Sequence, residues 1–581
     1  MPPNNDLLSL IPVEIWALVF GFLQWESWTA LHSLNLSCRL FHEIVSPVLF
    51  KALCIRFPRF PGGMRNSQTD NKHKRLHERL RPDNIVSFHH YVRFLTISGR
   101  NISVADSHGA SIVKLVESLP NLEIIRWRGI TFPPHLFRVI KAKQQVPLFH
   151  YEGLALPLVE DDVLLGAPFI KSLNITCRPK ARCGNNIDIN TLGAVILSLP
   201  NLKRLVLQYN PGPHILGNTD CAPTPIFDLP PATTLPPLRV LCLANFAFSP
   251  EQAAAWARSL AQRQTLHRLD LDGAADMTVL VDHLSNRGGA VSGLRSVSFR
   301  IHDATRSGNI SRVTSSLGRL LRQITHLSAF SAHDLPKEVL HKVIAQHRGT
   351  LRQLRWRHTW FPLLDSYFAS AQEQNPIGVR RSSEERSLDC IFSPGELRDL
   401  TEKLPHVERL GVDLCFRRNA PLPYTHLSAL ASFPRLKYLE LNTPTLQRTY
   451  VPIRDVPCVN ESVAEDAFQY IAAERSCHGK EGSAEATQSR LVQLAIKAGE
   501  WEYFTWDIND RSARYIPFAI VCWRKDATGA PPDTVRILRV DFQSSWRRVF
   551  LEQDQFEQAM DVAGLWAGER EGGLRFGPRI W

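Results

Sequence analysis

The fold is decided by a short stretch that reads Leu199-Pro200-Asn201-Leu202-Lys203-Arg204-Leu205-Val206-Leu207. The proline after Leu199 indicates the end of a helix, because a residue that precedes a proline is disfavoured in the α region. From Leu202 onward the apolar residues follow the order L-x-x-L-x-L, which sets alternate side chains of a short strand on one face. The stretch therefore predicts a helix, a break and a strand in direct succession.

The same order recurs along the chain, in residues 119–125, 235–243, 404–410 and 433–441. Most successive strand starts are about 28 residues apart, and repeats of this kind run about 20 to 29 residues. Two steps are near twice that length, as expected where a repeat is missed or carries an insertion. The strand starts can be placed at Val92, Leu122, Ile170, Leu202, Leu238, Leu266, Leu294, Ile324, Leu351, Val407, Leu436, Leu491 and Val535.

This pattern is the strand signature of a leucine-rich repeat. We therefore expect an α/β fold, a solenoid in which a curved parallel sheet carries helices on its convex side. The apolar strand positions should turn inward and stack on those of neighbouring repeats, while the positions between them face outward on the concave side. A repeat array also accommodates a chain of 581 residues, a length at which a single core would divide into domains.

The N-terminal fifty residues follow a different, helical pattern. Pro12 suits the first position of a helix and Glu14 suits its first turn, where the helix dipole favours a carboxylate. An apolar stripe at helical spacing follows, and we expect it to face inward. The stripe consists of Ile15, Leu18, Val19, Phe22 and Leu23.

A second apolar face of this first helix holds Trp16 and Phe20. We expect it to be uncovered within the fifty residues, so that the rest of the chain or a partner must cover it. Two further helices are predicted over 28–36 and 39–45, the last one ending near Ser46-Pro47.

This segment resembles an F-box, a three-helix module with prolines near its start and its end. Residues 11–15, Ile-Pro-Val-Glu-Ile, are similar to the Leu-Pro-x-Glu-Ile opening of that family, and residues 47–50 to its closing Pro-x-Leu-Phe. Val19-Phe20, Leu23 and Cys38-Arg39 match family positions between them. The departure is Phe41, where many members carry Trp, but an aromatic ring is kept. The alternative is a small helical bundle that only caps the next domain.

An F-box followed by leucine-rich repeats is a recognised pairing. The resemblance implies a substrate-recognition adaptor of a Skp-cullin-F-box ubiquitin ligase, in which the F-box binds the Skp-family adaptor and through it a cullin-RING ligase. The repeats would hold a protein substrate of unknown identity. The residues expected to bind the adaptor are Leu10, Ile11, Pro12, Glu14, Ile15, Trp16, Val19, Phe20, Leu23, Leu34, Cys38 and Pro47.

Two rival functions remain open at this point. One is a leucine-rich-repeat scaffold that binds proteins outside a ubiquitin ligase. The other, more distant, is a hydrolase whose catalytic residues are scattered along the chain. The ligase adaptor and the scaffold are not enzymes and need no cofactor.

Basic residues recur just after the first leucine of the strands. This position holds Lys or Arg at residues 93, 171, 203, 239, 295, 352, 437 and 536, with His267 between them. Stacked repeats would join them into a basic stripe suited to acidic or phosphorylated substrate segments, although Lys and Arg also suit a soluble strand flank. The concave-face residues expected to contact substrate are Arg126, Arg204, Arg239, Arg268, Arg295, Arg355, Arg409 and Tyr438.

These patterns divide the chain into an F-box over 1–53, a basic linker over 54–90, the solenoid over 91–545 and a C-terminal cap or tail over 546–581. The linker region is strongly charged, since residues 51–82 hold nine Lys and Arg against two acids, within a net charge of +12 for the chain. It lacks interleaved aromatic residues, which disfavours a nucleic-acid partner.

Motifs that carry chemistry are missing from the sequence. It has no G-x-S-x-G, no Gly-rich G-K-[ST] loop and no H-E-x-x-H, and Cys177 and Cys183 have no second pair at zinc spacing. We therefore expect no catalytic residues and no metal.

Eleven irregularly placed cysteines favour reduced thiols in a cytoplasmic or nuclear protein. The apolar start has no basic residue before Arg39 and is too short for a span, so we expect no membrane association.

Overall fold

In a computed structural model, the chain forms two compact units. The first unit comprises residues 1–210, 226–241 and 573–581, and the second comprises residues 211–225 and 242–572. The structure describes residues 15–16, 19, 28–56, 89–98, 109–128, 135–153, 165–177, 189–209, 224–230, 233–273, 277–287, 291–301, 310–333, 335–357, 392–414, 416, 421–443, 459–478, 491–498, 518–524 and 535–541.

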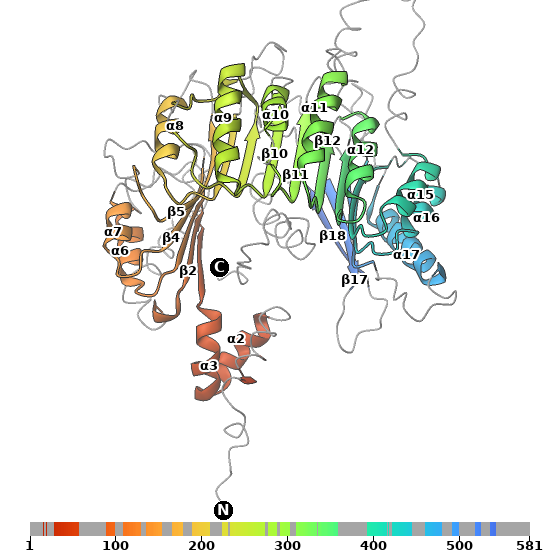
Figure 1. Cartoon of the computed structure of the whole chain (residues 1–581). Helices are drawn as coiled ribbons and strands as arrows, with labels where there is room; N and C mark the ends of the chain where they lie inside the picture. The colour runs from red at the N-terminus through yellow and green to blue at the C-terminus, as the bar shows by residue number, and fades with distance from the viewer. Residues whose placement is uncertain are drawn as a thin grey trace, which may run out of the picture. The chain divides into compact units, whose positions relative to one another are not determined.

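The first unit begins with helices. Residues 15, 16 and 19 are helical, and two complete helices follow, α2 (Trp28–Ser37) and α3 (Arg39–Leu49) (Figure 1). The predicted helix end near Ser46-Pro47 is wrong, because Pro47 lies inside α3. Proline removes one backbone hydrogen bond there, but the helix closes one more turn when the Phe50 N–H donates to the Ser46 carbonyl at 2.9 Å.

In the rest of the first unit the strands follow chain order, and every paired neighbour is parallel. Figure 1 shows its helices on one side of the sheet. The strands are β1 (Ala52–Arg56), β2 (Phe94–Ser98), β3 (Ile124–Arg128), β4 (Leu148–Gly153), β5 (Ile170–Cys177) and β6 (Arg204–Tyr209). The helices are η2 (His89–Tyr91), α6 (Gly109–Ser118), α7 (Leu136–Ala142) and α8 (Ile189–Ser198).

The division between the units falls within β8 (Val240–Ala244). In the second unit, helices alternate with parallel strands from β10 to β16. The first elements are α9 (Pro250–Arg263), β10 (Arg268–Gly273), α10 (Met277–Ser285), β11 (Ser296–Ile301), α11 (Ile310–Gln323), β12 (Ala329–His333), α12 (Lys337–His347) and β13 (Gln353–Arg357). They are followed by α15 (Pro394–Lys403), β14 (Arg409–Asp413), α16 (Tyr424–Ala431), β15 (Tyr438–Thr443), α17 (Glu461–His478) and β16 (Gln493–Ala498).

Two helices of this unit begin with the same local signature. Ser249 and Ser393 each precede a proline, and each side chain accepts a hydrogen bond from the backbone N–H three residues later. The side chains of Gln252 and Glu396 in turn accept a hydrogen bond from the backbone N–H of the serine, which completes a capping box. Proline fits directly after the cap because the first helical N–H has no partner within the helix. The sequence therefore fixes where α9 and α15 begin.

The strand pattern L-x-x-L-x-L is confirmed by the sheet register. We number repeat positions from the first apolar residue, so that Leu266 is position 1 and Leu269 is position 4 of the repeat that contains β10. Position 4 forms one row across the second unit, and each of its side chains is buried. The row consists of Leu269, Val297, Phe330, Leu354, Leu410, Leu439 and Leu494. The layering is thus mixed α/β, with a long and mostly parallel sheet.

Some predicted registers need correction. The long step from Leu122 to Ile170 contains one more repeat, whose strand is β4. This repeat starts at Val146, because Leu148 pairs with Ile124, which is at position 3. The repeat predicted from Ile324 starts at Leu327 instead, since the Ser328 N–H donates to the Arg295 carbonyl in the position-2 row. The two double-length steps are insertions, because β13 pairs directly with β14 and β15 pairs directly with β16.

Both predicted ends of the solenoid also differ from the structure. Residues 52–56 were divided between the F-box and the linker, but they form β1, which pairs in parallel with β2. Its repeat starts at Phe50, so the last residue of the F-box-like motif is also position 1 of the first repeat. At the other end, β17 (Phe518–Arg524) and β18 (Val535–Asp541) are antiparallel to their neighbours. The repeat predicted from Val535 is therefore wrong, and these strands form an antiparallel extension of the sheet.

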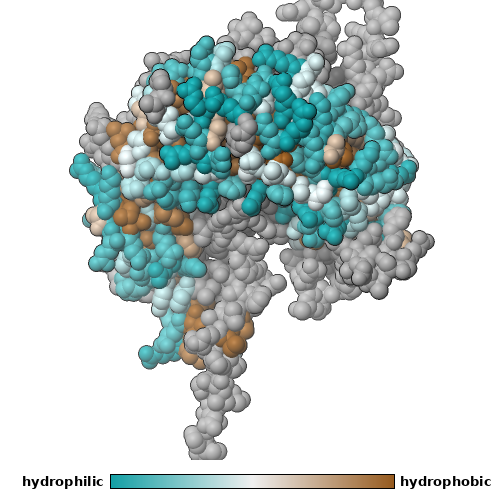
Figure 2. Space-filling model, viewed as in Figure 1, coloured by the Kyte–Doolittle hydropathy of each residue, from teal (hydrophilic) through white to brown (hydrophobic). Residues whose placement is uncertain are grey.

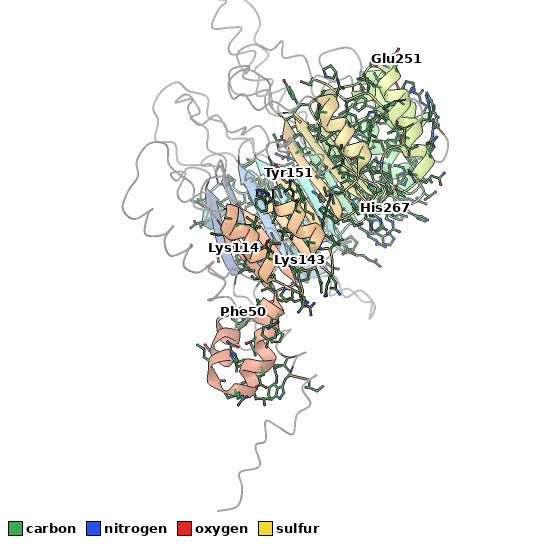
Figure 3. The ribbon with its side chains drawn as sticks, turned by 90° about the vertical axis from the view of Figure 1, so that its left-hand side faces the viewer. Phe50, Lys114, Lys143, Tyr151, Glu251 and His267 are labelled. Atoms are coloured by element: carbon green, nitrogen blue, oxygen red, sulfur yellow. The ribbon has the colours of Figure 1, made fainter. Side chains whose placement is uncertain are left out.

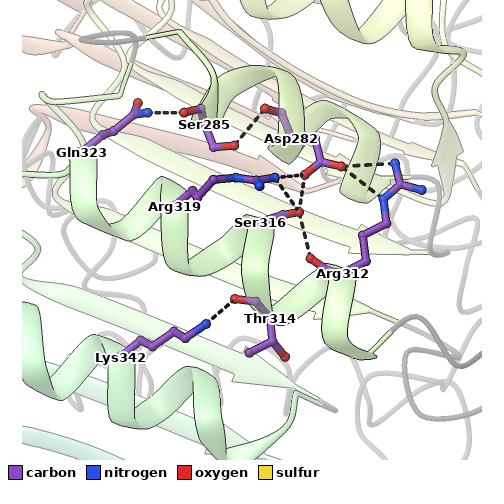
Figure 4. Close-up of polar contacts among 8 residues, drawn as sticks. All are labelled: Asp282, Ser285, Arg312, Thr314, Ser316, Arg319, Gln323 and Lys342. Carbon is purple, nitrogen blue, oxygen red and sulfur yellow. Dashed lines mark hydrogen bonds and ion pairs between the residues drawn. The ribbon is translucent and has the colours of Figure 1, made fainter.

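Polar contacts join consecutive helices of the second unit (Figure 4). Asp282 on α10 accepts hydrogen bonds from Arg312 at 3.2 and 3.1 Å and from Arg319 at 2.9 Å, both on α11. Ser316 on α11 also donates to this carboxylate. Lys342 on α12 donates to the Thr314 carbonyl at 3.0 Å. Side chains thus hold α10 to α11 and α11 to α12, in addition to the shared apolar layer.

Among the described helices, none has the length and apolar composition needed to cross a membrane. The described residues also contain no group of three or more metal-ligand side chains.

Candidate functional site

The N-terminal helices enclose a small apolar core. Phe41, Val45 and Leu49 of α3 form its centre, and the Trp16 ring packs edge-on against Phe41 with the ring centroids 5.0 Å apart. The expectation that Trp16 belongs to an uncovered face is therefore wrong. Helical spacing shows that the first helix has two apolar faces, but it does not show which one turns inward. The large indole ring takes the inner side because it buries more apolar area than a branched aliphatic side chain.

A neighbouring side of the first helix carries Ile15 and Val19. Their side chains are 48% and 40% exposed, although both were expected to point inward. Residues four apart lie on the same side of a helix, so the two form one apolar surface. Figure 2 shows hydrophobic residues at the surface of the N-terminal helices. A surface of this kind is costly in water and is typical of a protein contact.

The other residues predicted to bind an adaptor have various environments. Leu34 is half-buried against the small core. Cys38 caps α3, with its Sγ accepting from the Phe41 N–H at 3.5 Å, and is a free thiol. Pro47 is exposed on α3. The remaining predicted residues lie outside those that the structure describes, namely Leu10, Ile11, Pro12, Glu14, Phe20 and Leu23.

The sheet face away from the helices carries a buried charged cluster in the second unit. Glu440 on β15 pairs with Arg355 on β13 at 2.8 Å and with Lys497 on β16 at 3.0 Å. Arg357 lies 3.8 Å from Asp413 on the neighbouring strand, and both are almost fully buried. All five occupy positions 5 or 7 of their repeats, so they share one face of the sheet.

These pairs control the ionisation of the cluster. Burial by itself would raise the pKa of Glu440, but Arg355, Lys497 and Arg357 together outweigh it and lower that pKa to about 2. Burial lowers the pKa of Lys497 to about 8, and the attraction of Glu440 offsets only part of this effect. Glu440 is therefore an anion held among cations, and its carboxylate is occupied by partners from the same sheet.

Several arginines predicted to contact substrate are engaged in the same way. Arg268 pairs with Asp270 of its own strand at 2.6 Å, and Arg126 lies 3.8 Å from Glu152. The Arg409 guanidinium stacks over the Tyr438 ring, 4.6 Å from its centroid. Together with Arg355, these residues hold the sheet face rather than extend freely from it. Arg204 is half-buried, whereas Arg239 and Arg295 are exposed.

The basic stripe at position 2 is interrupted by acids. Glu123 occupies this position between Arg93 and the next repeat and pairs with Arg93 at 3.6 Å. Glu408 occupies it beside Lys437 and pairs with that lysine at 3.0 Å. Sequence reasoning missed both acids because it collected the basic residues alone. The same repeat alignment, applied to every residue type, identifies them.

No protein-family model matches this chain, and no curated protein matches it either.

Proposed function

We propose that this protein is a substrate-recognition adaptor of a Skp-cullin-F-box ubiquitin ligase. The observation that carries the proposal is the exposed apolar surface of Ile15 and Val19, on a helical segment that has its own small core. The position of these two residues within the F-box-like motif supports a Skp-family adaptor as the partner of this surface. Binding there would remove from water the exposed part of two branched apolar side chains, each of which contributes about 1.5 to 3 kcal/mol when it goes from full exposure to full burial.

The connection between the helices and the repeats supports a role in positioning. Only Phe50 and Lys51 separate α3 from β1, and Phe50 is already the first position of a repeat. The Lys51 carbonyl accepts from the N–H groups of Arg93 and Phe94 at 2.9 and 3.0 Å, so β1 is paired from its first residue. The predicted basic linker follows β1, and its residues 57–88 lie outside those that the structure describes.

The function that follows is proximity. A substrate bound to the repeats would be held near the ubiquitin-conjugating enzyme that the ligase recruits, which raises the effective concentration of its lysines at the thioester. The chain itself forms and breaks no bonds in this scheme.

A scaffold outside a ligase is the second candidate. It is favoured by one observation, that the N-terminal helices adjoin β1, which is the edge strand of the first unit's sheet. Helices in such a place can simply cap a repeat array. A cap needs only the packing of Trp16 against Phe41 inside the helical segment. An adaptor contact also needs the exposed side chains of Ile15 and Val19.

The two candidates are separated by copurification of the full-length chain with a Skp-family adaptor. The variant Ile15→Asp/Val19→Asp should lose the adaptor by at least about ten-fold, because two charges would have to be buried without partners. The matched control is Leu165→Asp, since Leu165 is 43% exposed but belongs to the repeats. Failure of the wild-type chain to retain the adaptor would favour the scaffold, and equal retention by the double variant and the wild type would mean that Ile15 and Val19 are not the adaptor contact.

A further inference from the structure

One part of the position-2 row differs from the rest. Lys171, Lys203 and Arg239 occupy it on three consecutive strands of the first unit. The Lys203 N–H donates to the Lys171 carbonyl at 2.9 Å, and the Arg239 N–H donates to the Lys203 carbonyl at 2.7 Å. Because adjacent strands lie about 4.8 Å apart, the three cationic side chains leave the sheet edge side by side.

These three cations have no acidic partner among the described residues, unlike Arg93 and Lys437 in the same row. Lys203 and Arg239 are exposed. The pKa of Lys171 is lowered by partial burial and by the nearby charge of Lys203, as expected for two ammonium groups without a shared anion. Within the described part of the chain, these three side chains therefore carry positive charge without a paired acid.

An apolar row at position 3 ends on β4, the strand next to the one that carries Lys171. Leu148 on β4 is 38% exposed and follows Phe94 and Ile124 at position 3 of successive repeats. The register shifts between β4 and β5, where Phe149 pairs with Ile170 and His150 pairs with Ser172. Lys171 is the extra residue of this bulge. It lies on β5, the strand that pairs with the Leu148-bearing strand β4. We call Leu148, Lys171, Lys203 and Arg239 the basic–apolar edge.

We propose that the basic–apolar edge binds an acidic segment of a partner protein that carries one apolar side chain. Carboxylates would pair with Lys171, Lys203 and Arg239, and the apolar side chain would pack on Leu148. A protein segment suits the edge better than nucleic acid does, because the cations end at a leucine and not at an aromatic stacking platform. The identification of this segment as a ligase substrate rests on the proposed function, but the binding itself does not.

Binding can be measured with full-length protein by fluorescence anisotropy, using a short labelled peptide of glutamates around one leucine as the probe. The variant Lys203→Glu/Arg239→Glu should weaken binding at least about ten-fold, and Leu148→Ser about three-fold. The matched control is Lys114→Glu/Arg138→Glu, which makes the same charge change on α6 and α7; Figure 3 shows Lys114 on the helical side of the first unit. The control should bind the peptide like the wild type.

Three results would overturn the proposal. They are no binding by the wild type, equal weakening in the helix control, and tighter binding of a single-stranded oligonucleotide that the edge variant loses.

The variant Ile15→Asp/Val19→Asp separates the two proposals. If the wild type fails to retain the Skp-family adaptor while both proteins bind the peptide equally, the ligase function falls and the edge stands. If adaptor binding is intact but no peptide binds, only the edge falls.

Discussion

Arg355 on β13 reaches across β14 to Glu440 on β15, with its Nη2 2.8 Å from the Glu440 Oε1. The strand between them carries Gly411 at the same position, so no side chain blocks the path. A methyl group at Gly411 would lie only 2.9 Å from the Arg355 Cγ. The ion pair therefore depends on a glycine that takes no part in it.

The first prediction concerns this glycine. Gly411→Ala should displace Arg355 and leave Glu440 with one cation fewer, which lowers the free energy of unfolding by about 1 to 3 kcal/mol. Urea denaturation of the full-length chain measures the loss. Gly349→Ala is the control, because nothing lies within 4 Å of a Cβ at Gly349. An equal effect of the two substitutions would contradict the role assigned to Gly411.

The second prediction concerns pH. The pKa of Glu440 is about 2 in the folded chain against an ordinary value of 4.5, so the unfolded chain binds the extra proton in this range. The stabilisation is present above about pH 4.5 and is lost as the pH falls toward 2, with a size on the order of 3 kcal/mol. In urea titrations, wild type should exceed Glu440→Gln in stability at neutral pH and approach it in acid. A gap that is independent of pH would refute this.

The third prediction tests which face of the first helix turns inward. Trp16→Ala should remove about 3 kcal/mol of packing against Phe41 and increase hydrogen exchange in α3. Ile15→Ala, on the exposed face, should change exchange very little. The reverse order of the two effects would restore the inward stripe expected from the sequence.

The fourth prediction compares two aspartates. Asp282 is 17% exposed and bonds to Arg312, Arg319 and Ser316, so Asp282→Ala should cost about 1 to 3 kcal/mol in the urea assay. Asp399 is 68% exposed and lies 4.0 Å from Lys403, so Asp399→Ala should cost less than about 0.5 kcal/mol. Similar costs for both would mean that the contacts between α10 and α11 are not a source of stability.

The sequence predicts the repeat fold because its apolar residues are dictated by local burial. Leu202, Leu205 and Leu207 must all leave water, and their spacing alone reveals the strand. The repeat at Val146 was missed because its positions 4 and 6 hold Phe149 and Tyr151 in place of leucine. Ile324 and Leu327 offer equally good starts, and only pairing with the strand before them decides between the two.

The charged cluster could not be predicted in the same way. The pairing of Arg355 with Glu440 requires β13, β14 and β15 to be neighbours, across an insertion after Arg357 that hides their adjacency in the sequence. It also requires the missing side chain at Gly411. Likewise, the inward turn of Trp16 depends on the ring of Phe41, which belongs to another helix. Local patterns show which residues are apolar or charged, but tertiary neighbours decide how they are used.

The most direct test of the central claim is copurification of the full-length chain with a Skp-family adaptor. The wild type and Leu165→Asp should retain the adaptor in comparable amounts, and Ile15→Asp/Val19→Asp should lose it while its repeats remain folded by circular dichroism. Failure of the wild-type chain to retain any adaptor would contradict a role in a ubiquitin ligase.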